Sequence, residues 1–138
     1  MIIANFIKGI EVKYKNYHFS GICFDSSKCK KDNIFFAIRG TKIDGNRFIN
    51  HAIQKGAKTI ISNQKFEGIK KKILFIRSSN VRKSLSEFAY TTHKDKPKNI
   101  IAVTGTNGKS SVADFYFQLL NLSNKKVASI GTLGIRTK

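Results

Sequence analysis

Short apolar runs alternate with polar turns along the part of the chain that precedes Pro97. The runs are rich in Phe and Ile and are bounded by polar residues, which is the pattern of short β-strands. The longest apolar runs, 34–38 and 100–103, have the length of strands and fall far short of a membrane span. Strands are therefore predicted at residues 17–24, 33–38, 58–62 and 73–76.

Apolar residues recur at helical spacing in two segments between or after these strands. Residues 47–55 carry an apolar face and are followed by Gly56, which suits a helix C-cap. Asn80 can cap a second helix through Thr92, whose apolar residues again fall on one face. Together, the strands and helices predict a small α/β domain.

A polar segment at residues 93–99 marks the clearest boundary in the chain. It is rich in Lys and contains the only proline, Pro97, which ends whatever precedes it. We therefore predict two domains, 1–95 and 96–138. The second is expected to contain an apolar strand at 99–104, a glycine-rich turn, a helix that ends at Leu122 and a strand at 126–130. One such unit leaves a parallel sheet uncovered, so we expect the opening of a larger, truncated domain.

The chain is strongly basic, with a formal net charge of +18 at pH 7. Such a charge is typical of proteins that bind nucleic acids. The positive residues, however, are mostly Lys and are scattered through loops, whereas bidentate contacts to bases or phosphates require Arg. We therefore expect the charge to attract an anionic nucleotide substrate, and nucleic-acid binding is the less favoured alternative.

The N-terminal segment indicates a cytoplasmic protein with no membrane partner, and this setting in turn bears on the cysteines. The N-terminus lacks the basic segment of a signal peptide. The two cysteines, Cys23 and Cys29, do not form a CxxC pair, and with His18 they make too few ligands for a zinc site. Reduced thiols are therefore predicted for both cysteines.

A glycine-rich segment reads Thr-Gly-Thr-Asn-Gly-Lys-Ser-Ser and lies between the predicted strand and helix of the second domain. Gly105 and Gly108 let backbone N–H groups turn inward around an anion, and the helix N-terminus adds its positive dipole end. Lys109 can reach the β- and γ-phosphates of ATP, and the Ser110 hydroxyl can bind Mg²⁺. Val103 stands where the general phosphate-loop pattern has its first glycine, so a tight strand–helix turn is the alternative. The predicted ATP-binding residues are Gly105, Thr106, Asn107, Gly108, Lys109, Ser110 and Ser111.

The run Thr-Gly-Thr-Asn-Gly-Lys resembles the ATP loop of the Mur ligases and of their relatives, the cyanophycin and folylpolyglutamate synthetases. These are amide ligases that activate a carboxylate as an acyl phosphate. Residues 24–40 and 44–57 resemble the UDP-binding domain shared by the Mur ligases that add the third and fourth amino acids. Thr106 and Asn107 favour the tripeptide synthetases, which add the third. Residues 129–134 are similar to the strand and turn that follow the first helix of those synthetases.

The resemblance implies a UDP-substrate site in the first domain, formed at a strand end and in a following loop. Its residues are Phe24, Ser26, Thr41, Lys42 and Ile43. Ser26 can also close the strand in a local turn, and Lys42 can be a solvated loop charge. Asp44–Gly45 is interpreted as a turn before a helix. The sequence departs from the family pattern at Ser27, which replaces an Arg of the UDP site, and at Asn33, which replaces an Asp.

By this resemblance, the chain is the N-terminal part of a Mur ligase that adds diaminopimelate or lysine to UDP-N-acetylmuramoyl-L-Ala-D-Glu in peptidoglycan synthesis. ATP and Mg²⁺ are the implied cofactors, because ATP converts the D-glutamyl carboxylate to an acyl phosphate that the incoming amine attacks. The remaining catalytic groups are expected beyond Lys138. The chain alone is therefore expected to form no amide bond, and to be either a remnant of a ligase or one piece of a split ligase with a separately encoded remainder. The alternative is a stand-alone UDP-sugar-binding module without catalysis.

Overall fold

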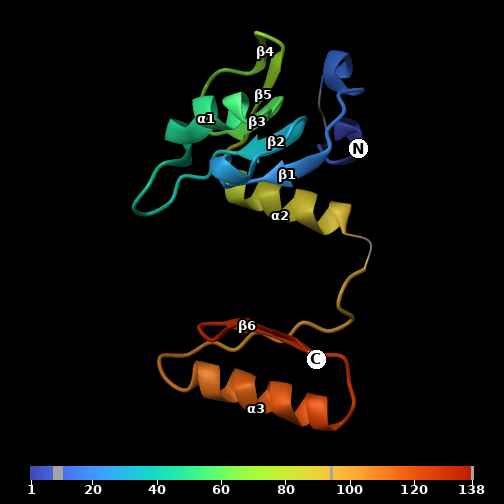
Figure 1. Ribbon diagram of the computed structural model, residues 1–138, viewed down its shortest axis with the longest axis vertical. Coiled ribbons are helices and arrows are strands. Elements are labelled where there is room, and N and C mark those ends of the chain that lie inside the picture. The colour runs from blue at the N-terminus through green and yellow to red at the C-terminus, as the bar shows by residue number, and fades with distance from the viewer. Residues whose placement is uncertain (8–10, 94, 138) are drawn as a thin grey trace. The chain divides into compact units, whose positions relative to one another are not determined.

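The computed structural model describes residues 1–7, 11–93 and 95–137 of the chain (Figure 1). It divides into two compact units, Met1–Asp95 and Lys96–Lys138. The division falls inside the polar, proline-containing segment that the sequence marks as a boundary. No helix within the described ranges is long and apolar enough to cross a bilayer.

Among the described residues, the first unit contains a five-stranded sheet in the order β1-β2-β3-β5-β4. The strands β1, β2, β3 and β5 run parallel, and β4 pairs antiparallel with β5 at the edge. The strands are β1 (Gly21–Cys23), β2 (Asn33–Phe36), β3 (Thr59–Ser62), β4 (Gly68–Lys70) and β5 (Ile73–Arg77). The predicted α/β fold class is confirmed. The sequence pattern misses β4, because this short edge strand has no apolar run and its Ile69 is 50% exposed.

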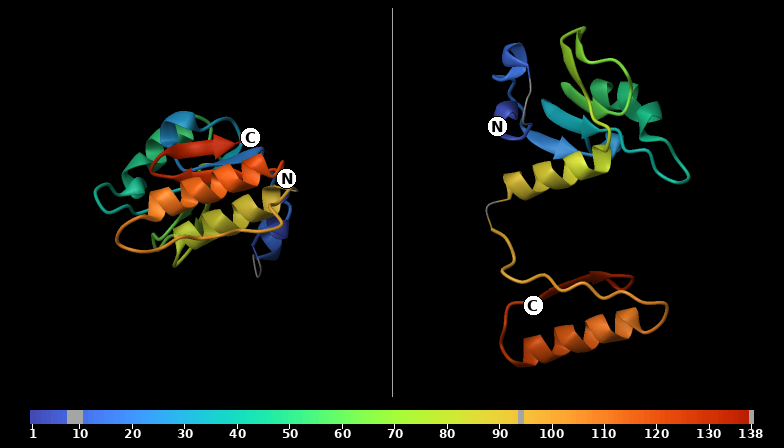
Figure 2. Two further views of the ribbon diagram at one scale, coloured as in Figure 1. Left: turned by 90° about the horizontal axis from the view of Figure 1, so that it is seen from below. Right: turned by 180° about the vertical axis from the view of Figure 1, so that it is seen from behind.

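Helices α1 and α2 cover opposite faces of this sheet (Figures 1 and 2). Helix α1 (Ile49–Gln54) follows the 3₁₀ turn η4 (Gly45–Phe48), and α2 (Val81–Thr92) follows β5. As predicted, Asn80 caps α2, because its side-chain oxygen accepts a hydrogen bond from the backbone N–H of Lys83 at 2.9 Å. Further 3₁₀ turns are η1 (Ile3–Asn5), η2 (Val12–Tyr14) and η3 (Ser26–Lys28).

Buried apolar residues form a core on each face of the sheet. Because successive side chains of a strand point to opposite faces, Ile34 and Phe36 of β2 enter one core and Phe35 enters the other. The first core gathers around Phe88 of α2, whose ring lies 4.9 to 6.0 Å from other phenylalanine rings, centroid to centroid. The second core contains the fully buried Ala52 of α1. Every residue of β2 and of β3 is buried, so these two neighbouring strands form the interior of the sheet.

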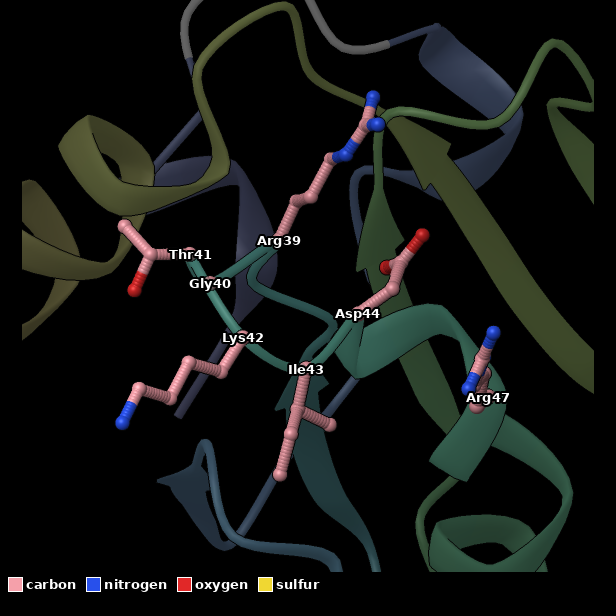
Figure 3. A pocket seen from close by; sticks show the side chains of 7 residues that line it. All are labelled: Arg39, Gly40, Thr41, Lys42, Ile43, Asp44 and Arg47. Carbon is pink, nitrogen blue, oxygen red and sulfur yellow. The ribbon is translucent and has the colours of Figure 1, made fainter.

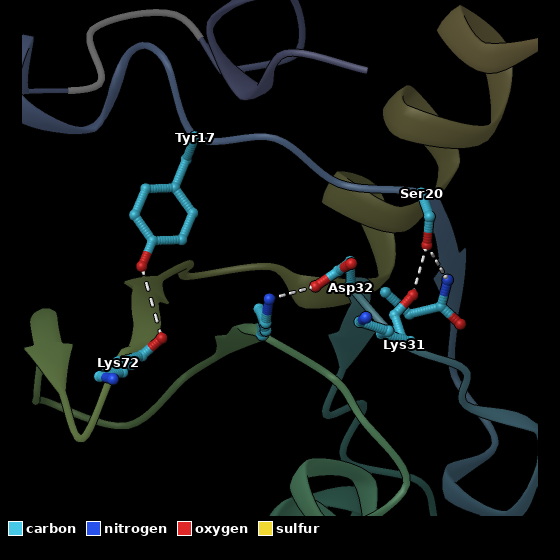
Figure 4. Close-up of polar contacts among 7 residues, drawn as sticks. Tyr17, Ser20, Lys31, Asp32 and Lys72 are labelled. Atoms are coloured by element: carbon cyan, nitrogen blue, oxygen red, sulfur yellow. Dashed lines mark hydrogen bonds and ion pairs between the residues drawn. The ribbon is translucent and has the colours of Figure 1, made fainter.

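Polar contacts tie the start of β2 to the segments beside it (Figure 4). The Ser20 hydroxyl donates to the backbone oxygen of Lys31 at 2.7 Å, and the buried Asn33 side chain donates to the Ser20 oxygen at 3.2 Å. Asn33 also accepts a hydrogen bond from the backbone N–H of Lys30 at 2.7 Å. An ionised aspartate at this position would accept but not donate. The departure from the family pattern at Asn33 therefore has a structural reason in this chain.

A disulfide joins Cys23, at the end of β1, to Cys29, six residues later. The prediction of two reduced thiols, which rested on a cytosolic setting, is wrong for this structure. The η3 turn folds the chain back on itself, so that the two Cα atoms lie 5.8 Å apart, within the range that a disulfide spans. Both cysteines are buried in the core that α1 closes.

The second unit contains helix α3 (Lys109–Leu122), followed by an antiparallel hairpin of β6 (Ala128–Gly131) and β7 (Gly134–Thr137). The helix ends where the sequence predicts, but residues 99–104 form no strand, and Ile100 is 83% exposed. A strand needs a neighbour to complete its hydrogen bonds, and none of the residues described from 95 to 137 pairs with this segment. The hairpin also differs from the parallel unit that the pattern predicts.

Helix α3 carries apolar residues at helical spacing along one face, but this apolar stripe is exposed. Phe115 and Leu119 are 69% and 62% exposed. The helix contacts the hairpin on another side, where Phe117 is buried and the Arg136 guanidinium lies 4.6 Å from the centroid of its ring. Arg136 also forms an ion pair with Asp114. An exposed apolar face of this extent normally packs against further structure.

The ring of Phe88 offers a test of the first core. Phe88→Ala should lower the free energy of unfolding by about 3–5 kcal/mol, because it leaves a cavity where a ring is 2% exposed. Phe115→Ala is the matched control, since the same change at a ring that is 69% exposed should shift the urea midpoint little. Urea unfolding followed by circular dichroism measures both. Equal shifts for the two variants would contradict this description of the core.

Candidate functional site

The loops that follow β1 and β2 leave the sheet at the same edge. The two strands are adjacent and parallel, so their carboxyl ends point the same way. Residues 24–28 follow β1 and residues 37–44 follow β2. Every residue that the sequence assigns to the UDP-substrate site lies in one of these two segments. The structure therefore brings both halves of the predicted site to one edge, which is where parallel α/β sheets bind ligands.

The segment after β1 is a short turn held by its own side chains. Phe24 is 67% exposed at the strand end. The Asp25 carboxylate accepts hydrogen bonds from the Ser27 hydroxyl at 2.7 Å and from the Ser27 backbone N–H at 3.0 Å, which caps η3. These two donors, the hydroxyl first, hold the pKa of Asp25 below its ordinary value of 3.8. Ser27, which replaces the arginine of the family pattern, thus stabilises the turn itself.

Ser26 is buried rather than exposed at this edge. It is 8% exposed, and its hydroxyl oxygen lies 3.0 Å from Nδ1 of His51 in α1. His51 itself is exposed. The sequence pattern does not single out His51, because it is one polar residue on a helix face. Its link to Ser26 depends on how α1 returns to the turn after β1.

The segment after β2 forms a tight loop closed by backbone contacts. The N–H of Gly40 donates to the Ile43 oxygen at 2.9 Å. At Gly45 the chain passes so close to the end of β2 that a Cβ would lie 2.5 Å from the backbone oxygen of Ile38. Only glycine fits there without displacing the backbone. Asp44 caps the η4 turn, which agrees with the interpretation of Asp44–Gly45 as a turn before a helix.

A hollow of about 270 Å³ lies at this loop (Figure 3). Its lining combines backbone, cationic side chains and a single carboxylate. The lining residues are Arg39, Gly40, Thr41, Lys42, Ile43, Asp44 and Arg47. In Figure 3 the Lys42 side chain extends away from the side of the loop that carries Asp44. Thr41, Lys42 and Ile43, the three residues of this loop that the sequence assigns to nucleotide binding, all line this hollow.

Asp44 is the acid in this lining, and its charge is well stabilised. Its pKa is held below the ordinary value of 3.8, chiefly by the backbone N–H of Asn46 and also by the Asn46 side chain and the charges of Arg39 and Arg47. An antiparallel bridge also joins Arg39 to Asp44. With Lys42, the cations outnumber the carboxylate, which suits a diphosphate. Sequence reasoning missed Arg39 and Arg47 as members of the site, because only the fold of the loop brings them together.

The glycine-rich loop is exposed at the N-terminus of α3. Gly105 and Gly108 adopt φ angles of 143° and 73°, conformations that favour glycine. Lys109 begins the helix, and its side-chain nitrogen donates to the backbone oxygens of Gly105 and of Thr106, the latter at 3.1 Å. Residues 105–111 are all exposed. The loop therefore presents a cation and the free N–H groups of a helix N-terminus to solvent, as a phosphate-binding loop requires.

A parallel sheet whose strand ends carry a cationic hollow, followed by a glycine-lined loop at a helix N-terminus, defines a nucleotide-binding type of α/β architecture. The chain matches the family described as "Mur ligase family, catalytic domain" over residues 18–101. It belongs to the Mur ligase family. The family resemblance inferred from the sequence motifs is confirmed.

Several relatives carry the name UDP-N-acetylmuramoyl-L-alanyl-D-glutamate--2,6-diaminopimelate ligase. The protein of that name from Rickettsia prowazekii is 42% identical over 122 residues, which are 88% of this chain and 25% of the relative. The one from Clostridium tetani is 42% identical over 135 residues, which are 94% of this chain and 27% of the relative. The chain thus spans about a quarter of the length of these curated relatives.

Solved structures give the same picture. A structure of UDP-N-acetylmuramoyl-L-alanyl-D-glutamate--2,6-diaminopimelate ligase superimposes with a TM-score of 0.78 and 25% identity over 99% of this chain and 28% of the other. The MurF ligase from Thermotoga maritima, solved in complex with ADP, has a TM-score of 0.58 and 24% identity over 76% of this chain and 23% of its own. The second likeness is one of fold.

The Asp25 carboxylate offers a test of the turn after β1. Because its pKa is depressed in the folded chain, it contributes stability that is complete above the ordinary value of 3.8 and is lost as the pH falls through the folded pKa. Ser27→Ala removes the hydroxyl that depresses this pKa most, so the titration midpoint of Asp25 should rise toward 3.8. Carboxylate carbon signals followed by NMR through the acidic range measure it. The midpoint of Asp44 is the internal control and should stay below 3.8. An unchanged midpoint for Asp25 would contradict this account.

Proposed function

We propose that this chain provides the UDP-substrate site and the ATP loop of an ATP-dependent amide ligase that adds the third residue in peptidoglycan synthesis. The substrate class is UDP-N-acetylmuramoyl-L-alanyl-D-glutamate, and the names of the relatives favour 2,6-diaminopimelate over lysine as the added residue. The observation that carries the proposal is the convergence of the five assigned substrate residues on neighbouring strand ends, beside a cationic hollow. A cytoplasmic location is proposed with it.

The first unit supplies groups suited to each part of a uridine diphosphate. The exposed ring of Phe24 offers an apolar surface on which a pyrimidine can stack. The loop at Thr41 and Ile43 offers backbone groups, and the exposed Lys42 offers an ammonium for the diphosphate. The charge of the whole chain, +18, increases the local concentration of such an anion.

The second unit supplies a loop suited to the phosphates of ATP. Gly105 and Gly108 keep the backbone open, and Lys109 is placed to exchange its contacts with loop oxygens for contacts with phosphate oxygens. The exposed Ser110 hydroxyl would hold Mg²⁺, with Ser111 beside it. The metal, when bound, neutralises charge on the phosphate oxygens during acyl phosphate formation.

In this proposal, the chain binds the UDP substrate and ATP. The groups that complete the amide bond belong to parts of the ligase that correspond to the unmatched length of the relatives. About three-quarters of the length of those relatives lies outside the match. The exposed apolar stripe of α3 agrees with this division, because it offers a face for further structure. The remaining parts of a ligase of that length are the partner that this account requires. No turnover is expected from the chain alone.

Two lysine variants test the proposal, and each serves as the control for the other. Lys42→Ala should weaken binding of UDP-N-acetylmuramoyl-L-alanyl-D-glutamate and leave ATP binding unchanged. Lys109→Ala should do the reverse. Each loss should be about 10- to 100-fold, corresponding to roughly 1.5–3 kcal/mol for a hydrogen bond to a charged group. Calorimetric titration at physiological salt measures both, since low salt exaggerates general attraction of anions to a basic chain.

Distinct outcomes separate this proposal from its alternatives. Tight binding of the UDP substrate without any response to ATP would favour a stand-alone UDP-sugar-binding module. Equal weakening of both ligands by either variant would mean that only the overall charge is sensed, and the proposal would be wrong. Binding of duplex DNA that falls steeply with salt, with no binding of the UDP substrate, would indicate a nucleic-acid-binding protein.

A further inference from the structure

We propose that His51 is a positioning residue for the uridine nucleotide, because it sets the orientation of the Ser26 hydroxyl. The inference rests on the proposed function, in which Ser26 contacts the UDP part of the substrate. His51 lies in α1, outside both loops assigned to the substrate, and acts through Ser26 rather than by touching the ligand.

The contact between the two side chains joins a buried hydroxyl to an anchored helix. Nδ1 of His51 lies 3.0 Å from the oxygen of Ser26, which is 8% exposed. A serine hydroxyl carries one proton and two lone pairs, so this bond fixes its rotamer and leaves hydrogen-bonding capacity for a ligand. The next residue of α1, Ala52, is fully buried in the core, so the backbone that carries His51 is fixed.

The other restraints on the turn act on its backbone. The disulfide between Cys23 and Cys29 closes the segment, and the Asp25 carboxylate caps η3. Within the part of the chain that the structure describes, His51 is the side chain that bonds the Ser26 hydroxyl. Loss of the imidazole should therefore leave the turn closed and release only the hydroxyl. Without His51, the entropic cost of orienting that hydroxyl would arise when the ligand binds, and it would weaken binding; with His51, this cost already arises when the chain folds.

The geometry also predicts which replacement restores the contact. Asparagine carries its polar atoms at the same distance along the side chain as Nδ1, whereas glutamine carries them at the distance of Nε2. Because Nδ1 is the atom that contacts Ser26, His51→Asn should retain the hydrogen bond and His51→Gln should not. The pair separates an oriented contact from a general need for a polar side chain.

The test is calorimetric titration of the full chain and its variants with UDP and with UDP-N-acetylmuramoyl-L-alanyl-D-glutamate. His51→Ala and His51→Gln should weaken binding of both ligands about tenfold, the usual effect of one lost hydrogen bond. His51→Asn should restore most of the affinity. Thermal unfolding should be nearly the same for all variants, because His51 is exposed.

Repeating the His51→Ala substitution in a chain that already carries Ser26→Ala tests whether His51 acts on binding through the Ser26 hydroxyl. If His51 acts through the hydroxyl, His51→Ala should cause no further loss of affinity once Ser26 has been replaced. A full additional loss would overturn the positioning role, as would wild-type affinity in His51→Ala or equal affinities for the Asn and Gln variants. In each of those cases the unsubstituted chain still binds UDP, so the proposed function stands. Absence of UDP binding by the unsubstituted chain overturns both.

Discussion

The burial of β2 between parallel neighbours constrains the rest of the first unit. Every residue of this strand is buried, so its side chains must find apolar partners on both faces of the sheet. Helices α1 and α2 provide those partners from opposite sides. Parallel pairing with β1 then fixes the direction of both strands, and the loops that follow them are forced to the same edge.

The candidate substrate site is a consequence of that constraint. Neither the turn after β1 nor the loop after β2 belongs to regular strand structure, yet both are fixed at their starts by rigid strands. The loop after β2 leads directly into α1, because the close approach at Gly45 turns the chain back along the sheet. Helix α1 in turn brings His51 to Ser26, which lies in the turn after β1. One connection therefore shapes the cationic hollow and holds the neighbouring turn.

The sequence predicts most of the first unit, because its signals are local. Apolar runs mark β2 and β5, and Asn80 marks the start of α2, because an apolar run and a helix cap can both be recognised from residues that are close in sequence. The predictions that are wrong concern contacts at a distance. Residues 99–104 have the composition of a strand, but composition supplies no hydrogen-bonding neighbour. The hairpin of β6 and β7 is likewise a matter of pairing that the pattern did not reveal.

The same distinction applies to the site. The motifs give Phe24, Ser26 and the loop at Thr41 by family resemblance, and they give the glycine-rich loop by its wording. The cationic neighbours Arg39 and Arg47, the partner His51 and the disulfide of the first turn are not marked by any local pattern. Each depends on a chain reversal that brings together residues separated along the sequence. Sequence reasoning therefore assigns roles to the residues that carry a motif and does not reach the residues that the fold brings beside them.

The most direct test of the central claim is NMR mapping of the isotope-labelled chain with UDP-N-acetylmuramoyl-L-alanyl-D-glutamate. The account predicts that amide shift changes concentrate in the segments 24–28 and 37–47, with saturation at physiological salt. The amide signals of α2 and β4 should not shift. Changes spread over lysine-rich loops throughout the chain, growing without saturation, would contradict it, because they would show only the attraction of an anion to a basic surface.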